Sequence, residues 1–248
     1  MSSRSIFQGA FAGRQVMVSG GTSGIGFALA AGFAEAGAAV LATGSSGARL
    51  AAARDAGAPA GVRFEQLDVR DKAAVAAAIG GLDRLDVLVN CQGVARPDAE
   101  WEEDTFLDVI DVNLSSAMRL SRAAHPLLKA SRGSIVNVAS MLSFLADASV
   151  PAYCASKTGI LGLTRALAHK WGVDGIRVNA IGPGYHRTEM TKPLWSDPAA
   201  ADRIAERSAV KRWGTTEDLV GPALFLASDA AGFVTGVVLP VDGGYHTG

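Results

Sequence analysis

A tyrosine and a lysine stand four residues apart in the stretch YCASK, which runs from Tyr153 to Lys157. On a helix, residues four apart share one face, so the phenol and the ammonium would lie side by side. A free tyrosine titrates at about 10, and a neighbouring cation favours the phenolate. We interpret Tyr153 as a proton donor and acceptor whose pKa Lys157 lowers. The alternative is a half-buried tyrosine beside a solvated lysine.

Ser140 ends a predicted strand, at the carboxyl edge where open α/β sheets bind ligands. Tyr153 follows after one short connection, near the start of the next predicted helix. The serine hydroxyl, the phenol and the ammonium are therefore expected to converge. By itself Ser140 is explained as a strand-end cap, and Asn113 as a helix residue that bonds a backbone group.

Short β-branched runs alternate along the chain with longer alanine-rich stretches. This rhythm predicts a parallel sheet, because its strands are apolar throughout and are joined by helices. The expected strands are 15–19, 39–43, 62–66, 86–90, 134–140, 176–181 and 237–241. The expected helices are about 24–36, 47–56, 71–80, 102–130, 152–171 and 216–228.

The predicted fold class is α/β: one doubly wound Rossmann-type domain over residues 1–248, with a seven-stranded parallel sheet and helices on both faces. The stretch at about 185–213 interrupts the rhythm with Pro, Gly and Trp. Long insertions at the carboxyl end of a sheet often close over a ligand, so we expect a substrate loop here. The alternative is an irregular surface excursion.

Composition excludes several classes of protein. The formal net charge is −1, so there is no basic field for nucleic acid or for an anionic membrane. The two cysteines give no disulfide framework, and the chain has neither a signal-peptide core nor an apolar run of ~18 residues, which a membrane span needs. The four histidines show no metal-ligand spacing. We expect a cytoplasmic protein without a metal site.

The stretch SGGTSGIG, residues 19–26, follows the first predicted strand and opens a helix. Residues without a Cβ allow a tight turn and let a pyrophosphate approach the backbone, while the helix N-terminus offers free N–H groups. This context favours a dinucleotide site over an ordinary tight turn.

Together with Ser140 and YCASK, this turn resembles the cofactor motif of the short-chain dehydrogenase/reductase family, with Ser19 where the family usually has Thr. The resemblance continues through LDV (67–69), NCQG (90–93), Pro183-Gly184 and the C-terminal FVTGVVLPVDGGY. It implies an NAD(P)-dependent oxidoreductase in which the cofactor carries the hydride.

The resemblance also implies a role for each matching residue. Tyr153 would be the general acid/base, Ser140 would polarise the carbonyl, Lys157 would lower the tyrosine pKa and hold the ribose, and Asn113 would anchor a water. The cofactor contacts would be Gly20, Thr22, Ser23, Gly24, Ile25, Gly26, Ser45, Ser46, Asp68, Val69, Asn90, Gly93, Tyr153, Lys157, Pro183, Gly184, His186 and Thr188.

The choice between NAD and NADP depends on the end of the second strand. Gly44 stands where NAD-preferring relatives carry Asp, and Ser45 stands where NADP users often carry Arg. Without the carboxylate a 2′-phosphate is not repelled, so we expect NAD or NADP with a preference for NADP. Two further departures are Gln92, which would narrow the ribose side, and His186, whose imidazole would face either the substrate or solvent.

The expected substrate is a secondary alcohol or ketone, on a sugar acid or polyol, because the run KRWGTTEDLVGPALFLASDAAGFVTGVVLPVDGGY (211–245) resembles the sugar-acid and polyol members of the family. It also resembles 3-oxoacyl carrier-protein reductases, which remain an alternative, as does a non-catalytic dinucleotide sensor or scaffold. The resemblance implies a homotetramer formed through the helices at 102–130 and 152–171. The expected substrate contacts are Ser140, Tyr153, Met141, Leu145, Tyr185, Met190 and Trp195.

Overall fold

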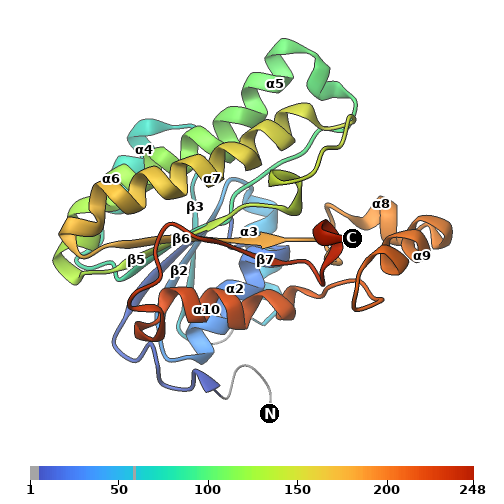
Figure 1. Cartoon of the computed structure of the whole chain (residues 1–248). Coiled ribbons are helices and arrows are strands. Elements are labelled where there is room, and N and C mark those ends of the chain that lie inside the picture. Colours follow the sequence, from blue (N-terminus) through green and yellow to red (C-terminus); the bar gives the residue numbers. More distant parts are fainter. Residues whose placement is uncertain (1–5, 58–59) are drawn as a thin grey trace.

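Seven parallel strands form a single sheet in the computed structural model, which describes residues 6–57 and 60–248 (Figure 1). Their order across the sheet is β3-β2-β1-β4-β5-β6-β7. The chain therefore reverses its direction of travel between β1 and β4, which creates a switch point at the carboxyl edge. The strands are β1 (Gln15–Ser19), β2 (Ala39–Gly44), β3 (Val62–Gln66), β4 (Val87–Asn90), β5 (Ser134–Val138), β6 (Arg177–Pro183) and β7 (Val238–Val241).

The register of the central strands aligns the segments that follow them. Ser19 pairs with Asn90, and Asn90 pairs with Asn137. The ends of β1, β4 and β5 thus lie level with one another. The turns that follow these strands start from the same edge of the sheet, which brings the glycine turn close to Ser140.

Helices cover both faces of the sheet, so the predicted doubly wound fold is confirmed (Figure 1). On one face, the first core cluster packs α2 (Gly24–Glu35), α3 (Gly47–Asp55) and α10 (Val220–Ala227) against the strands. On the other face, the second cluster packs α4 (Lys72–Gly80), α6 (Ser116–Ser131) and α7 (Pro151–Trp171). Phe33 and Leu120 are fully buried on opposite sides.

The helix expected over 102–130 is not regular. It consists of α5 (Glu103–Ile110), a π-helical segment (Asp111–Ser115) and α6. Single π-helical turns inside α-helices are frequent at functional sites. Here the irregular turn contains Asn113, whose amide makes side-chain hydrogen bonds to two other segments of the chain. Alanine-rich and amphipathic periodicity cannot reveal such a turn, because the helical pattern continues on both sides of it.

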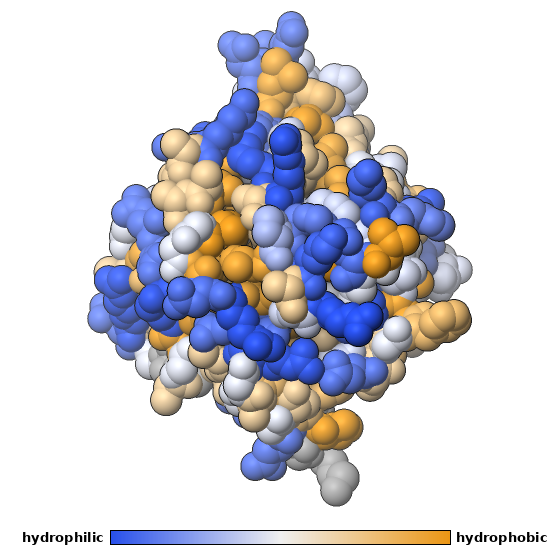
Figure 2. All heavy atoms as spheres, turned by 90° about the vertical axis from the view of Figure 1, so that its left-hand side faces the viewer, coloured by the Kyte–Doolittle hydropathy of each residue, from blue (hydrophilic) through white to orange (hydrophobic). Residues whose placement is uncertain are grey.

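The insertion after β6 folds into two short helices, α8 (Lys192–Trp195) and α9 (Pro198–Arg207). Figure 1 shows both beyond the carboxyl end of β6, close to the C-terminus. The opposite end of the molecule, seen in Figure 2, carries hydrophilic residues mixed with separate hydrophobic areas. Among the described residues, no helix has both the length and the apolar character needed to span a bilayer.

Candidate active site

The glycine turn packs too tightly for side chains. Gly20 has a φ of +77°, and a Cβ there would lie 2.6 Å from the backbone nitrogen of Gln92. A Cβ on Gly26 would collide with the carbonyl oxygen of Gly20. Ser23 caps α2 without a side-chain hydrogen bond to the helix. The first N–H groups of α2 therefore receive no bond from their own cap, and they fit the pyrophosphate of a dinucleotide.

The loop after β6 reaches the same turn. A Cβ added to Gly24 would lie 3.7 Å from the methyl carbon of Thr188. Thr188 is held by Thr191, whose hydroxyl accepts a bond from the Thr188 amide at 3.1 Å, and by the Trp195 indole, which donates to the Thr188 carbonyl at 3.0 Å. Pro183 is the last residue of β6, and Gly184 follows it directly. The structure thus brings Thr188 to the start of α2.

Ser140, Tyr153 and Lys157 come together at this edge. The Ser140 hydroxyl accepts a bond from the Leu142 amide at 3.1 Å, and it acts to lower the pKa of the nearby Tyr153 phenol. The Lys157 ammonium lies 5.5 Å from the centre of the tyrosine ring and donates to the Val138 carbonyl at 2.7 Å. Proline at the first position of α7 sets the helix start just before Tyr153.

The expected lowering of the tyrosine pKa is wrong for the protein alone. Burial raises the pKa of Tyr153 to about 12, and the hydrogen bond from Ser140 only partly opposes it. Burial also lowers the pKa of Lys157 to about 8. Desolvation penalises the charged form of both groups, and it is the largest cause of each shift. The phenol is therefore protonated at neutral pH.

Asn113 connects the loop after β4 to α7. Its amide oxygen accepts from the Val94 N–H at 2.8 Å, and its amide nitrogen donates to the Val94 carbonyl at 2.9 Å and to the Ser156 hydroxyl at 3.1 Å. A Cβ added to Gly93 would lie 3.6 Å from both the Asn113 oxygen and the Lys157 ammonium. Asn113 thus reaches the neighbourhood of Lys157, but its own side-chain bonds go to protein groups.

Asn90 and Gln92 begin the same loop and are buried. Asn90 donates to Asn137 at 2.9 Å and to Ser121 at 3.2 Å, while its own side-chain oxygen has no partner. Gln92 donates to the Ser116 hydroxyl at 2.8 Å. The glutamine therefore points into the protein toward α6, and not across the ribose side as expected. The Asn90 side-chain oxygen is thus a buried acceptor without a partner among the described residues.

The adenine end of the expected site is formed by the edges of β2 and β3. Asp68 accepts from the Arg70 guanidinium at 2.8 Å, and these bonds lower the pKa of Asp68. Val69, which follows it, is buried. Ser46 caps α3 by accepting from the Arg49 amide at 3.4 Å, and the Ser45 carbonyl accepts from Gln66. No sequence pattern indicates that the Asp68 carboxylate forms an ion pair with Arg70.

His186 is turned inward, so neither expectation for its imidazole holds. Only 3% of the residue is exposed, and its Nδ1 lies 3.1 Å from the Gly184 carbonyl oxygen. Burial lowers the pKa of this histidine. A Cβ on Gly214 would collide with the ring, which shows how closely the loop packs around it. His186 supports the β6 loop and does not face solvent.

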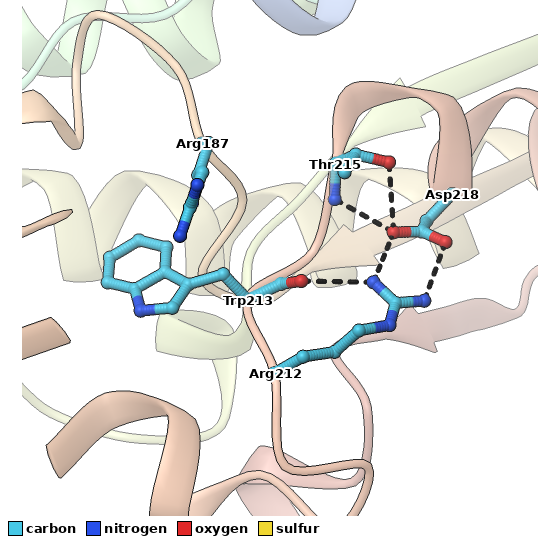
Figure 3. Close-up of a pocket in the computed structure, with 5 residues that line it drawn as sticks. All are labelled: Arg187, Arg212, Trp213, Thr215 and Asp218. Carbon is cyan, nitrogen blue, oxygen red and sulfur yellow. Dashed lines mark hydrogen bonds and ion pairs between the residues drawn. The ribbon is translucent and has the colours of Figure 1, made fainter. Parts of the chain in front are cut away.

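Beside this loop lies a cavity of about 440 Å³ (Figure 3). Arg212 turns toward Asp218, and its two nitrogens lie 2.8 and 2.9 Å from the carboxylate oxygens. Thr215 also donates to Asp218, whose pKa is lowered by the guanidinium. Arg187 points instead toward the Trp213 ring. The charges of this cavity are therefore mostly paired within the protein.

A second cavity, of about 140 Å³, begins one residue after Ser140. Of the expected substrate contacts, Met141, Leu145 and Tyr185 line it. Met190 and Trp195 do not: Met190 is 52% exposed, and Trp195 is bonded to the Thr188 carbonyl. The complete lining is Met141, Leu142, Leu145, Ala146, Asp147, Tyr185, Arg207 and Tyr245.

Sequence reasoning missed three residues of this region. Glu100 is fully buried and accepts from the Tyr153 amide at 2.8 Å. Arg207 and Tyr245 line the second cavity from α9 and from the C-terminal segment. Arg207 lies outside the quoted motifs and Tyr245 ends the C-terminal one, and only their place in the cavity that begins after Ser140 reveals them. Glu100 resembles any acid near a helix start.

Known proteins show the same architecture over nearly the whole chain. A family model described as "Enoyl-(Acyl carrier protein) reductase" matches residues 20–246. The 2-dehydro-3-deoxy-D-gluconate 5-dehydrogenase of Escherichia coli K12 is 37% identical, with 94% of this chain and 95% of that protein covered. The 5-keto-D-gluconate 5-reductase of the same organism is 34% identical, covering 94% and 95%.

A solved structure agrees with these relatives. The gluconate 5-dehydrogenase of Burkholderia cenocepacia, in complex with NADP and tartrate, superposes with a TM-score of 0.89 at 34% identity and covers 98% of both chains. Full-length similarity at this level, on a fold that carries the Ser140, Tyr153 and Lys157 arrangement, shows the family. The chain belongs to the short-chain dehydrogenase/reductase family of NAD(P)-dependent oxidoreductases.

Proposed function

We propose that this protein interconverts the secondary alcohol of a sugar acid and the corresponding ketone, with NADP as the preferred cofactor. One observation carries the proposal: the Ser140 hydroxyl, the Tyr153 phenol and the buried Lys157 ammonium lie together at the edge where the glycine turn also opens. The names of the relatives supply the substrate class, since they act on gluconate derivatives.

The chain's own groups suit ketone reduction. Ser140 donates a hydrogen bond that polarises the carbonyl, and Tyr153 gives its proton to the oxygen as negative charge develops there. The raised pKa of Tyr153, about 12, keeps the phenol protonated until it is needed. Lys157, at the far side of the ring, then stabilises the phenolate that remains. When bound, a nicotinamide supplies or accepts the hydride and, in its oxidised form, adds a positive charge nearby.

Several protein groups fit the cofactor. The open N–H groups of α2 suit the pyrophosphate, and the unpaired oxygen of Asn90 suits a ribose hydroxyl. Thr188 lies against Gly24 on the nicotinamide side. We assign the ribose to Lys157 as well, because its ammonium lies beside Gly93. Asn113 holds this loop in place, and we infer that it orders the water beside Lys157.

NADP is preferred because the end of β2 cannot carry the carboxylate that an NAD site uses. A Cβ on Gly44 would lie 2.5 Å from the Thr22 hydroxyl oxygen, so an acidic side chain has no room there. Ser45 and Ser46 follow as small polar residues, and Arg49 is exposed one turn later. The Burkholderia relative, which binds NADP, supports the same choice.

The assembly and the compartment are also proposals. We infer a homotetramer that buries the surfaces of α5 and α6, where Leu107 is 55% and Met118 44% exposed. Apolar side chains of this size at the surface mark an interaction site when they gather together. We place the protein in a reducing cytoplasm as a single cofactor-binding domain, because Cys91 and Cys154 are free thiols.

The test is a substrate screen with the cofactor absorbance as readout. We expect NADPH to support reduction of 5-keto-D-gluconate at a kcat/KM at least about tenfold above that with NADH or with a 3-oxoacyl thioester. The Tyr153→Phe variant should lose turnover while its NADPH dissociation constant stays within about twofold of wild type. Substantial activity in Tyr153→Phe would show that another group moves the proton, and tight NADPH binding without turnover of any substrate would favour a sensor.

A further inference from the structure

The second cavity is lined by a cation, Arg207, that has no anionic partner among the residues that the structure describes. Its wall begins at Met141, directly after the proposed catalytic serine, and includes Arg207 from α9. The cavity therefore lies between the segment that follows Ser140 and the insertion after β6. A ligand held here is the substrate of that same site, so its identity rests on the proposed function.

The Tyr245 ring, itself packed against Tyr185, holds the Arg207 guanidinium in place. Its central carbon lies 4.4 Å from the centre of the Tyr245 ring. That ring packs edge-on against Tyr185, with the centres 5.1 Å apart and an interplanar angle of 72°. A guanidinium over an aromatic face is attracted by the ring and keeps its N–H groups free at the edge. The position of the Arg207 side chain is thus fixed without using its hydrogen-bond donors.

Both lysines of the insertion are neutralised by neighbouring carboxylates. Lys192 lies 3.5 Å from Glu189, and Lys211 lies 3.5 Å from Glu206. Among the residues that the structure describes, Arg207 makes neither an ion pair nor a hydrogen bond through its side chain. An unpaired guanidinium beside a cavity is suited to a planar anion, because its fork matches a carboxylate with two parallel hydrogen bonds.

The rest of the polar lining suits hydroxyl groups. Asp147 uses one carboxylate oxygen, Oδ1, to accept from the Ser149 amide at 2.9 Å and from the Ser149 hydroxyl at 2.7 Å. Within the described chain its Oδ2 accepts no bond and is free for a donor. The Tyr185 and Tyr245 rings pack edge-on against each other and lie on the same wall. One cation, one carboxylate acceptor and two phenols match a carboxylate that is followed by hydroxyl-bearing carbons.

We propose that Arg207 binds the carboxylate of a polyhydroxy acid substrate, while Asp147 and the two phenols bond its hydroxyls. Arg207 would then decide specificity for acids over neutral sugars. Arg207 would bind the carboxylate equally well in the ground state and in the transition state. Its removal should therefore raise KM much more than it lowers kcat. The glycine turn, which would hold the cofactor, does not line this cavity, so cofactor affinity should not depend on Arg207.

The experiment compares Arg207→Met with Arg203→Met, a control one turn earlier on α9 that is exposed like Arg207 but does not line the cavity. The substrates are 5-keto-D-gluconate and L-sorbose, which carries a hydroxymethyl group in place of the carboxylate. We expect Arg207→Met to raise the KM for the acid about 10- to 100-fold, with kcat within about threefold. L-Sorbose turnover and NADPH affinity should change less than about twofold, and Arg203→Met should match wild type.

A binding measurement makes the inference independent of turnover. Calorimetric titration of tartrate into the NADP-loaded protein should show at least about tenfold weaker binding for Arg207→Met than for wild type. If tartrate binding weakens in this way although wild type reduces no keto acid, the proposed reaction is wrong and the anion site stands. The inference is overturned if Arg207→Met loses as much kcat/KM with L-sorbose as with 5-keto-D-gluconate, or if Arg203→Met has the same effect as Arg207→Met. It is also overturned if wild type binds tartrate no more tightly than Arg207→Met does.

Discussion

Glu100 holds the first turn of α7 and the loop after β4 through a single buried carboxylate. One oxygen accepts from the Arg96 amide at 2.8 Å and the other from the Tyr153 amide at 2.8 Å. The residue is 0% exposed. In Glu100→Gln only one oxygen remains for two N–H donors, and the new amide nitrogen faces the other donor. One of the two backbone amides must lose its partner in a place that water cannot reach.

The size of the effect can be worked out from this loss. Leaving a buried donor unsatisfied costs about 1–3 kcal/mol, with more when a charged acceptor is removed. We therefore expect the free energy of unfolding of Glu100→Gln to fall by about 1–3 kcal/mol. For a chain of this length that corresponds to a decrease in Tm of about 2–12 °C. The turnover number should fall as well, since the Tyr153 backbone is no longer fixed.

The pH profile separates positioning from mere destabilisation. The charge of Glu100 raises the pKa of Tyr153, although less than burial does. Removing that charge should lower the tyrosine pKa. Alcohol oxidation needs the phenolate, so the acid limb of kcat/KM should move to lower pH in Glu100→Gln. A variant that was only less stable would keep the wild-type limb at temperatures below its transition.

The assay is thermal and urea unfolding together with oxidation rates across the pH range. The control is Glu103→Gln, an exposed acid in the first turn of α5, which should remain within about 0.5 kcal/mol of wild type. If Glu100→Gln proves as stable as this control and keeps the wild-type pH profile, the buried carboxylate does not position Tyr153.

Two further predictions concern Lys157 and Gly44. Burial lowers the pKa of Lys157 from 10.5 to about 8, so between these pH values the lysine is protonated in the unfolded chain and deprotonated in the folded protein. The free energy of unfolding of wild type should therefore rise with pH in this range, by about 1.4 kcal/mol per pH unit relative to Lys157→Met. Urea unfolding of both proteins at pH 8 and 9.5 checks this, and an equal change of stability with pH in the two proteins would contradict it. Gly44→Asp should lose about 1–3 kcal/mol of stability by crowding Thr22. Adding Thr22→Ala should restore the fold and raise kcat/KM with NADH relative to NADPH, whereas an unchanged ratio would refute the steric account.

Regular periodicity made the architecture predictable. The seven strands and most helices lie within a few residues of their expected places, because apolar runs and alanine-rich stretches depend on short-range pattern alone. The glycine turn could be placed because sequence neighbours decide its shape. Ser140, Tyr153 and Lys157 could be brought together because strand ends and helix starts meet at one edge of a parallel sheet.

Long-range packing determined what the sequence could not show. The pKa of Tyr153 depends on how completely the phenol is desolvated, which no local pattern records. The inward turn of His186 depends on Gly214, and that of Gln92 on Ser116. Arg207 joins the site only because α9 folds back toward the segment after Ser140.

The π-helical segment at Asp111–Ser115 has a consequence for exchanging parts between relatives. One extra residue in that turn resets the rotational phase of everything downstream by about 100°. Leu120 and Ala124 face the core only in the resulting phase. Chimeras that join α5 from one protein to α6 from another must therefore conserve the residue count across this joint. Shortening it by one position would turn a charged face of α6 toward the sheet, however well each half matched its own parent.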